Sequence, residues 1–447
     1  MAERSFLSKS TFIRGIQCEK SLYLHKKRPF LRDRLPPEQL AKFARGHRVG
    51  LLARNLFPGG VDASPKSHFQ MGAAIKKTAE LIKAGVPVIY EASFEYNGVR
   101  VALDILYKDK DTWKAVEVKS SAAISETYMW DASLQYFVIT QSGLPLEDFF
   151  LAYVNYGYIR NGNIDMNQLF IIESVLDLVR GKQAAVEEHI AQLREVTNMT
   201  KSPEIPVGPH CHNPYPCDFI GHCWKHIPPE TGFDLSSFFD ETDILCEEAL
   251  KEPTGIFSSL YYTPAIPPYD GCSPYQKLVI SCGHALLDTD GADAQIIIAQ
   301  PGQALPLSDI KALFDGLDQY QSILVFDKDA ETDRLAFLLN GEPALKSRFS
   351  GISKKMIDMQ APYKNNNVKN LQQQLPLYPE KAAQILNSTI KKTPGRFKSR
   401  LEVSDWYEEM SRHFIDSEWY TGTKDVAFFH SNNLSLMKKL CQTMKEL

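Results

Sequence analysis

Two carboxylates and a lysine fall on neighbouring predicted strands in the first third of the chain. Asp104 lies inside the otherwise apolar run 101–106, and the next run, 115–120, carries Glu117 and Lys119. Side chains alternate across a strand, so Glu117 and Lys119 share one face while the valines beside them share the other. The pattern predicts three charged groups close together on a mostly apolar sheet, where unpaired charges are costly.

This set of residues suits a hard divalent cation. Mg²⁺ or Mn²⁺ is held by carboxylates, by a backbone carbonyl such as that of Val118, and by waters, with a substrate phosphate completing the shell. The ion lowers the pKa of a bound water, and Lys119 would orient that water or neutralise the phosphate. The alternative is a solvated Glu117–Lys119 pair on an edge strand. Asp104 on the preceding strand favours the metal site.

Four cysteines form the second candidate cluster. Cys211, Cys217 and Cys223 are evenly spaced in a segment rich in proline and glycine, and Cys18 lies on a predicted N-terminal helix. The opening residues lack the features of a secretory signal, so we expect a cytoplasmic protein, whose cysteines are thiols or metal ligands rather than disulfides. Thiolates suit an iron–sulfur cluster or zinc. For zinc, histidines are also available: His210, His212, His222 and His226.

The hydrophobic pattern predicts the elements that position these residues. Asn97-Gly98 is a two-residue hairpin signal, which joins two strands of a three-stranded meander. Helices are expected at 8–25, 37–57, 70–84, 126–142 and 166–193, and strands at 86–96, 99–108, 112–120, 149–156, 296–299 and 323–326.

Length and charge limit the organisation of the chain. A chain of 447 residues suits two domains, which we place at 1–229 and 255–447 with a linker at 230–254 containing a short helix. No apolar run approaches the roughly 18–20 residues of a membrane span, so no membrane partner is expected. Residues 1–60 carry thirteen lysines or arginines against four acidic residues, which suits contact with phosphates or a solvated basic surface.

The first half resembles the RecB-like branch of the PD-(D/E)XK nucleases. The resemblance rests on an early helix, the meander with Asp104 and then Glu117-x-Lys119, and a following helix with Gln135. It implies a restriction-endonuclease-like domain, a mixed central sheet flanked by helices. It also implies His47 as a further metal ligand, Gln135 as a positioning residue and Glu91 as another acidic residue.

This sequence departs from that pattern at one position. Relatives place a tyrosine four residues after the glutamine, whereas Ile139 stands there and Tyr136 is adjacent to Gln135. The contribution that this tyrosine makes to positioning DNA in relatives is therefore open in this chain. The metal-binding residues are unaffected by the departure.

The four cysteines resemble the iron–sulfur arrangement of the AddB and CRISPR-adaptation nucleases. There a [4Fe–4S] cluster pins the terminal segment onto the nuclease core, which implies Cys18, Cys211, Cys217 and Cys223 as its ligands, with zinc as the alternative. The spacing differs from the AddB pattern. It matches a bacterial family that carries a domain of unknown function.

The second half also resembles that family, whose C-terminal domain is similar to DnaQ-like exonucleases of the ribonuclease H fold. Active members need Asp-x-Glu on the first strand and a helical Asp near the end. These positions fall on Ser258, Leu260 and Asn432, although Asp327 and its acidic neighbours remain. Serine and leucine supply no charged ligand for Mg²⁺, so the resemblance implies a second α/β domain without catalytic activity.

Together these features predict a metal-dependent DNA nuclease acting on single- or double-stranded DNA in repair, recombination or defence. Its catalytic residues would be Asp104, Glu117 and Lys119, with His47, Glu91 and Gln135 in support. The alternative is a non-catalytic nucleic-acid-binding module that keeps a nuclease fold.

Overall fold

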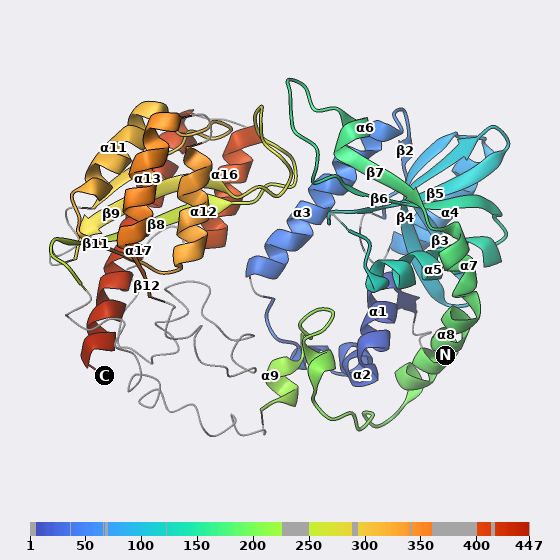
Figure 1. The fold of residues 1–447 in the computed structure, drawn as a ribbon. Helices are drawn as coiled ribbons and strands as arrows, with labels where there is room; N and C mark the ends of the chain where they lie inside the picture. Colours follow the sequence, from blue (N-terminus) through green and yellow to red (C-terminus); the bar gives the residue numbers. More distant parts are fainter. Residues whose placement is uncertain are drawn as a thin grey trace. The chain divides into compact units, whose positions relative to one another are not determined.

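A computed structural model describes residues 6–35, 37–65, 67, 70–121, 123–225, 250–287, 294–339, 342–359, 400–412 and 416–446. The chain divides into two compact units, residues 1–229 and 230–447. Each unit contains one mixed β-sheet with helices, so the protein is α/β as expected (Figure 1). Most of the expected linker and its short helix lie outside the described residues.

The first unit is built on a seven-stranded sheet in the order β2-β3-β4-β5-β6-β7, with β1 paired to β4. The predicted meander β3-β4-β5 is confirmed as antiparallel, and β5 and β6 are parallel. The strands are β1 Leu7–Ser8, β2 Val61–Asp62, β3 Val88–Tyr96, β4 Val99–Asp109, β5 Thr112–Lys119, β6 Leu146–Val154 and β7 Phe170–Ser174. Asn97 and Gly98 both have positive φ, at 47° and 69°, as a two-residue hairpin of this hand requires.

Helices cover the sheet. Helix α5 packs against β3, β4 and β6, and α1, α7 and α8 pack against α5. The helices are α1 Lys9–Gln17, α2 Glu19–Lys27, α3 Pro37–Ala53, α4 Met71–Lys83, α5 Glu126–Gln141, α6 Met166–Leu169, α7 Leu176–Gly181, α8 Gln183–Asn198 and α9 Ile220–Cys223. A core of fully buried side chains, including Phe12, Leu22, Leu103 and Phe149, fills the space between the sheet and these helices.

Two helices that were predicted to be continuous are interrupted in the structure. The helix expected at 8–25 is broken at Cys18, whose extended backbone (φ −165°, ψ 113°) ends α1 and begins α2. The long helix expected at 166–193 contains strand β7, whose residues hydrogen-bond to the edge of β6. An available sheet edge outweighs weak helical periodicity there, and Ile171 and Ile172 favour the extended backbone.

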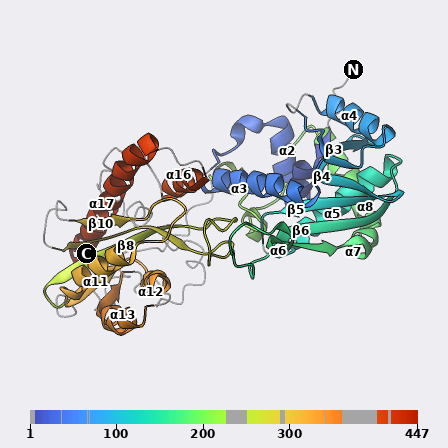
Figure 2. The same cartoon turned by 90° about the horizontal axis from the view of Figure 1, so that it is seen from above.

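The second unit has a five-stranded sheet in the order β10-β9-β8-β11-β12. Strands β10, β9 and β8 are antiparallel, whereas β8, β11 and β12 are parallel. The elements are β8 Thr254–Tyr262, β9 Leu278–Leu286, β10 Gln295–Ile298, α11 Leu307–Asp318, β11 Ser322–Val325, α12 Lys328–Leu338, α13 Pro343–Lys355, β12 Met356–Asp358, α16 Arg400–Arg412 and α17 Asp416–Glu446. Figure 2 shows α16 and α17 on one face of this sheet and α11, α12 and α13 on the other.

The predicted strands at 296–299 and 323–326 are confirmed within one residue as β10 and β11. In the part of the chain that the structure describes, no helix combines the length and apolarity that crossing a membrane requires.

Candidate active site and cysteine pocket

Asp104 and Glu117 come together where two neighbouring strands separate. The ladder between β4 and β5 runs from Asp109 and Thr112 up to the pair Ile105 and Val116. One residue further along, the Asp104 carboxylate takes the place of a backbone partner and accepts a hydrogen bond from the Val118 amide (N···Oδ2 2.6 Å). The sheet therefore opens at the two carboxylates, while β5 continues along β6 as far as Lys119.

One carboxylate oxygen of Glu117 has hydrogen-bond partners, and the other has none. Its side chain is almost fully buried, and Oε1 accepts hydrogen bonds from Lys119 Nζ at 2.9 Å and from Lys9 Nζ at 3.0 Å. The other oxygen, Oε2, is buried and has no hydrogen-bond partner. A buried carboxylate oxygen without a donor is unfavourable, and a cation is the partner that would satisfy it.

The charges around the site are unevenly compensated. Burial disfavours the ionised form of Glu117, but Lys119 and Lys9 outweigh burial and hold the pKa of Glu117 below its usual range. The pKa of Asp104 is raised, first by burial and then by the negative Glu117. Two ammonium groups thus stabilise Glu117, whereas Asp104 has less compensation and would gain most from a bound cation.

Lys119 is held by a second carboxylate that the sequence analysis missed. Its ammonium forms an ion pair with Asp131 on α5 as well as with Glu117, and it lies 5.1 Å from the centre of the Tyr128 ring. Burial opposes the charged form of Lys119, but Asp131 and Glu117 outweigh it and raise its pKa. Lys119 therefore remains an ammonium, which suits charge stabilisation and water orientation.

Gln135 acts on the lysine indirectly. It is fully buried on α5, one turn after Asp131, and its Nε2 lies 3.5 Å from Asp131 Oδ1. Its Oε1 is buried without a hydrogen-bond partner. Gln135 is thus in position to hold Asp131, which in turn holds Lys119.

Lys9 is the other residue that the sequence analysis missed. It is the first residue of α1, and it reaches Glu117 from a position 108 residues away in sequence. A lysine in the first turn of a short helix carries no local signal of such a contact. Only the pairing of β1 with β4, between Leu7 and Val99, brings the start of α1 to this part of the sheet.

Glu91 lies on β3 at the level of Asp104. The β3–β4 ladder pairs Tyr90 with Ile105 and Ala92 with Leu103, and Glu91 between them has a positive φ of 54°. This backbone conformation is uncommon for a residue with a side chain, and strain of this kind concentrates at functional sites. Glu91 forms a 3.6 Å ion pair with Arg54, and burial and then the charge of Glu117 raise its pKa above the usual value.

His47 lies on α3, which packs beside β5. The neighbouring Gly46 is close to Ser120, because a Cβ at Gly46 would lie 3.8 Å from Ser120 Oγ. His47 itself is exposed, between Phe43 and Leu51, which are also exposed. Its helix face is therefore not a core face, and within the described residues no hydrogen bond or ion pair joins His47 to Asp104 or Glu117.

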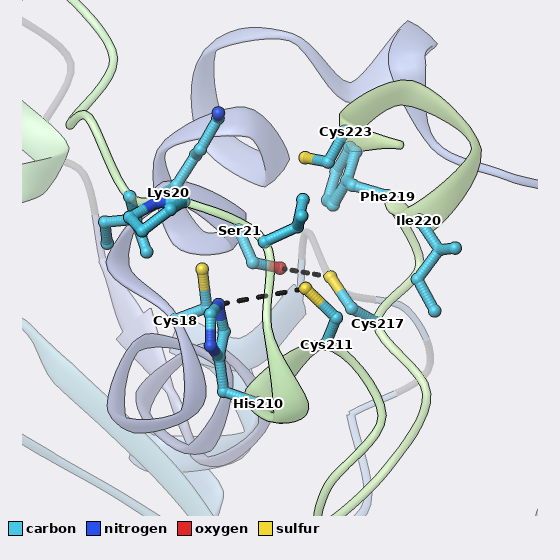
Figure 3. A pocket seen from close by; sticks show the side chains of 12 residues that line it. Cys18, Lys20, Ser21, His210, Cys211, Cys217, Phe219, Ile220 and Cys223 are labelled. Atoms are coloured by element: carbon cyan, nitrogen blue, oxygen red, sulfur yellow. Dashed lines mark hydrogen bonds between the residues drawn. The ribbon is translucent and has the colours of Figure 1, made fainter. Parts of the chain in front are cut away.

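The four predicted cysteines line one pocket (Figure 3). Cys18 comes from the junction of α1 and α2, Cys211 and Cys217 from the loop after α8, and Cys223 from α9. All four are free thiols, and Cys217 donates a 3.3 Å hydrogen bond to Ser21 Oγ. Ile205, Val207 and Phe219 contribute apolar lining, and Lys20, Ser21 and His210 contribute polar groups.

Two of the four thiols are favoured in the neutral form in the absence of a cation. Burial raises the pKa of Cys18 and Cys223, and the other cysteines add to the rise because neighbouring thiolates repel. A bound cation would reverse this preference, since a coordinating thiol is deprotonated. As the side chains stand, no three His, Cys, Asp or Glu groups among the described residues are close enough to hold one metal ion.

In the second unit, the predicted first-strand positions lie on β8. Leu260 is buried in an apolar cluster, and Ser258 Oγ hydrogen-bonds to His430 Nε2 at 2.8 Å. His430, from α17, also hydrogen-bonds through Nδ1 to Ser281 Oγ at 2.8 Å. The α17 residue that faces Ser258 is thus His430, while Asn432 lies half-buried two residues later.

Two of the acidic residues considered for a site in this unit, Asp327 and Glu331, are engaged in the fold. Asp327 caps α12 by accepting a hydrogen bond from the Ala330 amide. Glu331 is buried and bonded to Ser259 Oγ at 2.5 Å and to Arg334 at 2.7 Å. These contacts give both carboxylates a structural role.

Comparisons with known proteins reach part of the chain. Residues 261–378 match a family described as a domain of unknown function (DUF2779). No curated protein matches the chain. Among solved structures, the crystal structure of SSO0001 is similar at 12% identity over 43% of this chain and 78% of that chain, with a TM-score of 0.18. A likeness at this TM-score carries no argument about the fold.

Proposed function

We propose that residues 1–229 form a metal-dependent DNA nuclease of the RecB-like PD-(D/E)XK type, using Mg²⁺ or Mn²⁺. The observation that carries the proposal is the unpartnered, buried Oε2 of Glu117 beside Asp104, at the point where β4 and β5 separate. Two carboxylates with one unsatisfied buried oxygen and a fixed ammonium form a set that a hard cation and a phosphate would complete.

Each residue has a separate role in this proposal. Asp104 and Glu117 Oε2 hold the ion, which supplies an activated water and stabilises charge on the scissile phosphate. Lys119 stays protonated between Glu117 and Asp131 and faces the same space, so it can neutralise the phosphate or orient the attacking water. Gln135 keeps Asp131 in place. His47 and the Val118 carbonyl remain proposed further ligands.

DNA is the substrate that the basic N-terminal region favours. Helix α3, which packs beside β5, carries Lys42, Arg45 and Arg48. Basic side chains next to a metal site are suited to contacts with the phosphate backbone.

We further propose that the cysteine pocket holds a [4Fe–4S] cluster. Four thiols and several apolar side chains line it, which suits a cluster, and a coordinated cation would stabilise the neighbouring thiolates. His210 also lines the pocket and is a further donor that zinc could use. Zinc is the alternative. Four thiolates that bind one zinc ion, at Zn–S distances of about 2.3 Å, lie closer together than four thiolates that bind a four-iron cluster. The thiols here line the walls of a pocket, which favours the larger group.

For the second unit we propose a ribonuclease-H-like fold without catalytic activity. The sheet order β10-β9-β8-β11-β12 supports the fold, because it places the first strand centrally and the second antiparallel to it. The contacts of Ser258 with His430, and of Glu331 with Arg334, support the absence of a two-metal site.

The test is cleavage of labelled single- and double-stranded DNA by anaerobically purified full-length protein, with and without Mn²⁺. Metal-dependent cleavage should fall by about 10²- to 10³-fold in Glu117→Gln. The matched control is Glu147→Gln, because Glu147 is an exposed carboxylate on the same sheet that pairs with Lys114. DNA binding without cleavage in any metal would instead favour a non-catalytic binding module.

A further inference from the structure

Helix α1 connects the two candidate sites of the first unit. Its first residue, Lys9, hydrogen-bonds to Glu117, and the residue directly after its end, Cys18, lines the cysteine pocket. A helix of nine residues is about 13 Å long, so the two sites lie one short, rigid element apart.

The start of α1 is fixed against the catalytic strands. Ser8 caps the helix through reciprocal hydrogen bonds with Thr11, and β1 pairs with β4, the strand of Asp104. Along its length α1 packs closely on α8, because a Cβ at Gly15 would lie 2.5 Å from Leu193 Cδ2. These contacts place the Lys9 ammonium on Glu117 Oε1 at 3.0 Å.

The end of α1 is fixed by the cysteine loop, the loop between α8 and α9 that carries Cys211 and Cys217. Gln17 Nε2 donates to the carbonyls of His210 at 2.8 Å and Tyr215 at 2.7 Å, on either side of Cys211. Arg14 forms a 2.7 Å ion pair with Asp218, the residue after Cys217. The loop that supplies Cys211 and Cys217 therefore also holds the C-terminal half of α1.

We propose that Lys9 is a positioning residue of the nuclease site and that α1 couples it to the cysteine pocket. Lys9 and Lys119 together engage Oε1 of Glu117, which leaves Oε2 as the buried oxygen without a hydrogen-bond partner. Ordering of the cysteine loop by its bound group fixes α1 and keeps Lys9 on Glu117. Loss of that group releases the loop, then α1, and finally Glu117. This inference rests on the proposed nuclease function for its kinetic readout only.

The contact at Lys9 is tested with Lys9→Met and Lys9→Arg in the full-length protein. Lys9→Met should lower kcat for DNA cleavage by about tenfold with little change in KM, because a charge-assisted hydrogen bond to the metal carboxylate is lost. Lys9→Arg should restore most of the rate. Lys114→Met removes a lysine–carboxylate pair from the other end of β5 and is the matched control. A wild-type kcat in Lys9→Met overturns the positioning role.

The coupling is tested by amide hydrogen exchange with Cys217→Ser and Gln17→Ala. Both should speed exchange in residues 9–17 and in residues 112–119. Lys9→Met should speed it only in 112–119 and leave the iron or zinc content unchanged. Gln17→Ala keeps all four thiols, so it decides the question if Cys217→Ser does not fold. Wild-type exchange of 112–119 in Gln17→Ala overturns the coupling.

The two readouts separate this inference from the proposed function. Hydrogen exchange reports the link whether or not the protein cuts DNA. If the exchange pattern is as expected but no nucleic acid is cleaved, the link stands and the nuclease assignment fails. If DNA is cleaved and the exchange of 112–119 is unaffected, the nuclease stands and the link fails.

Discussion

At the scale of single residues, the candidate active site is defined by which charges have partners. Lys9 and Lys119 are matched by Glu117 and Asp131, all within ion-pair distance. Asp104 is the additional carboxylate, and it has a backbone amide as its hydrogen-bond donor. A cluster with one excess negative charge is stable only if that carboxylate takes up a proton or a cation is bound.

Replacing Asp104 by asparagine should separate activity from stability. Asparagine can still accept the Val118 hydrogen bond but removes the charge that burial and Glu117 disfavour. In metal-free buffer at pH 7, Asp104→Asn should therefore raise the free energy of unfolding by on the order of 1–3 kcal/mol. Metal-dependent cleavage should be lost. Chemical denaturation and the DNA assay measure the two effects, and a destabilised variant with full activity would contradict both.

His430 in the second unit should make stability depend on pH. Burial, and then the positive Arg400, lower the pKa of His430 from 6.5 to about 3, so the folded state holds the imidazole neutral. The unfolded chain takes up a proton below about pH 6.5, which favours unfolding. As the pH falls from 6.5 to 5, the second unit should lose stability with a slope that rises toward about 1.4 kcal/mol per pH unit. His430→Gln should show a shallower decline, and equal slopes would rule out this origin.

At the scale of elements, two interruptions of regular structure create the sites. Strands β4 and β5 separate after Ile105 and Val116, so the next residues along, Asp104 and Glu117, are not paired in the ladder. The extended backbone at Cys18 turns α2 back against α1 and directs a thiol into the pocket. A continuous helix over residues 8–25 would not bring Cys18 and Ser21 to the loop in this way.

The four cysteines of the pocket should be required together for iron. Serine at Cys18, Cys211, Cys217 or Cys223 should abolish the visible absorbance and iron content of anaerobically purified protein and lower its melting temperature. Cys282, buried in the second unit, is the control, because Cys282→Ser should leave the iron content unchanged. Stoichiometric zinc in a colourless protein would identify the other metal.

At the scale of the whole molecule, two α/β units with different sheet orders divide the chemistry unequally. In the first, two strands separate at charged residues, whereas in the second β8 carries Ser258, bonded to His430, and the buried apolar Leu260. Helix α17 packs against β8, β9 and β10, and its buried His430 bonds to Ser258 on β8 and Ser281 on β9.

The second unit should therefore contribute no cleavage of its own. Full-length Asp104→Asn, whose first site is expected to be silent, should leave single-stranded DNA, double-stranded DNA and RNA intact with Mn²⁺ present. Degradation that disappears on further replacement of Asp327 by alanine would show that the second unit is active. Asp327→Ala alone serves as the control for its role in capping α12.

The sequence by itself determined the local arrangement of the first site. Alternation on β5 placed Glu117 and Lys119 on one face, and Asn97-Gly98 set the hairpin that brings β3 against β4. These features depend on residues that are neighbours in sequence, so the alternation of side chains along a strand and the residue types of a turn predict them. The even spacing of Cys211, Cys217 and Cys223 likewise marked three cysteines that line one pocket.

The tertiary structure decided the contacts that cross the chain. Lys9 reaches Glu117, and Asp131 reaches Lys119, because β1 joins β4 and α5 covers the sheet. Packing also decided three further features, because it determines which sheet edges and helix faces stay uncovered. These features are the exposure of His47, the strand inside residues 166–193 and the pairing of Ser258 with His430. No local pattern reports such contacts, since each arises from the free energy of burying distant segments against one another.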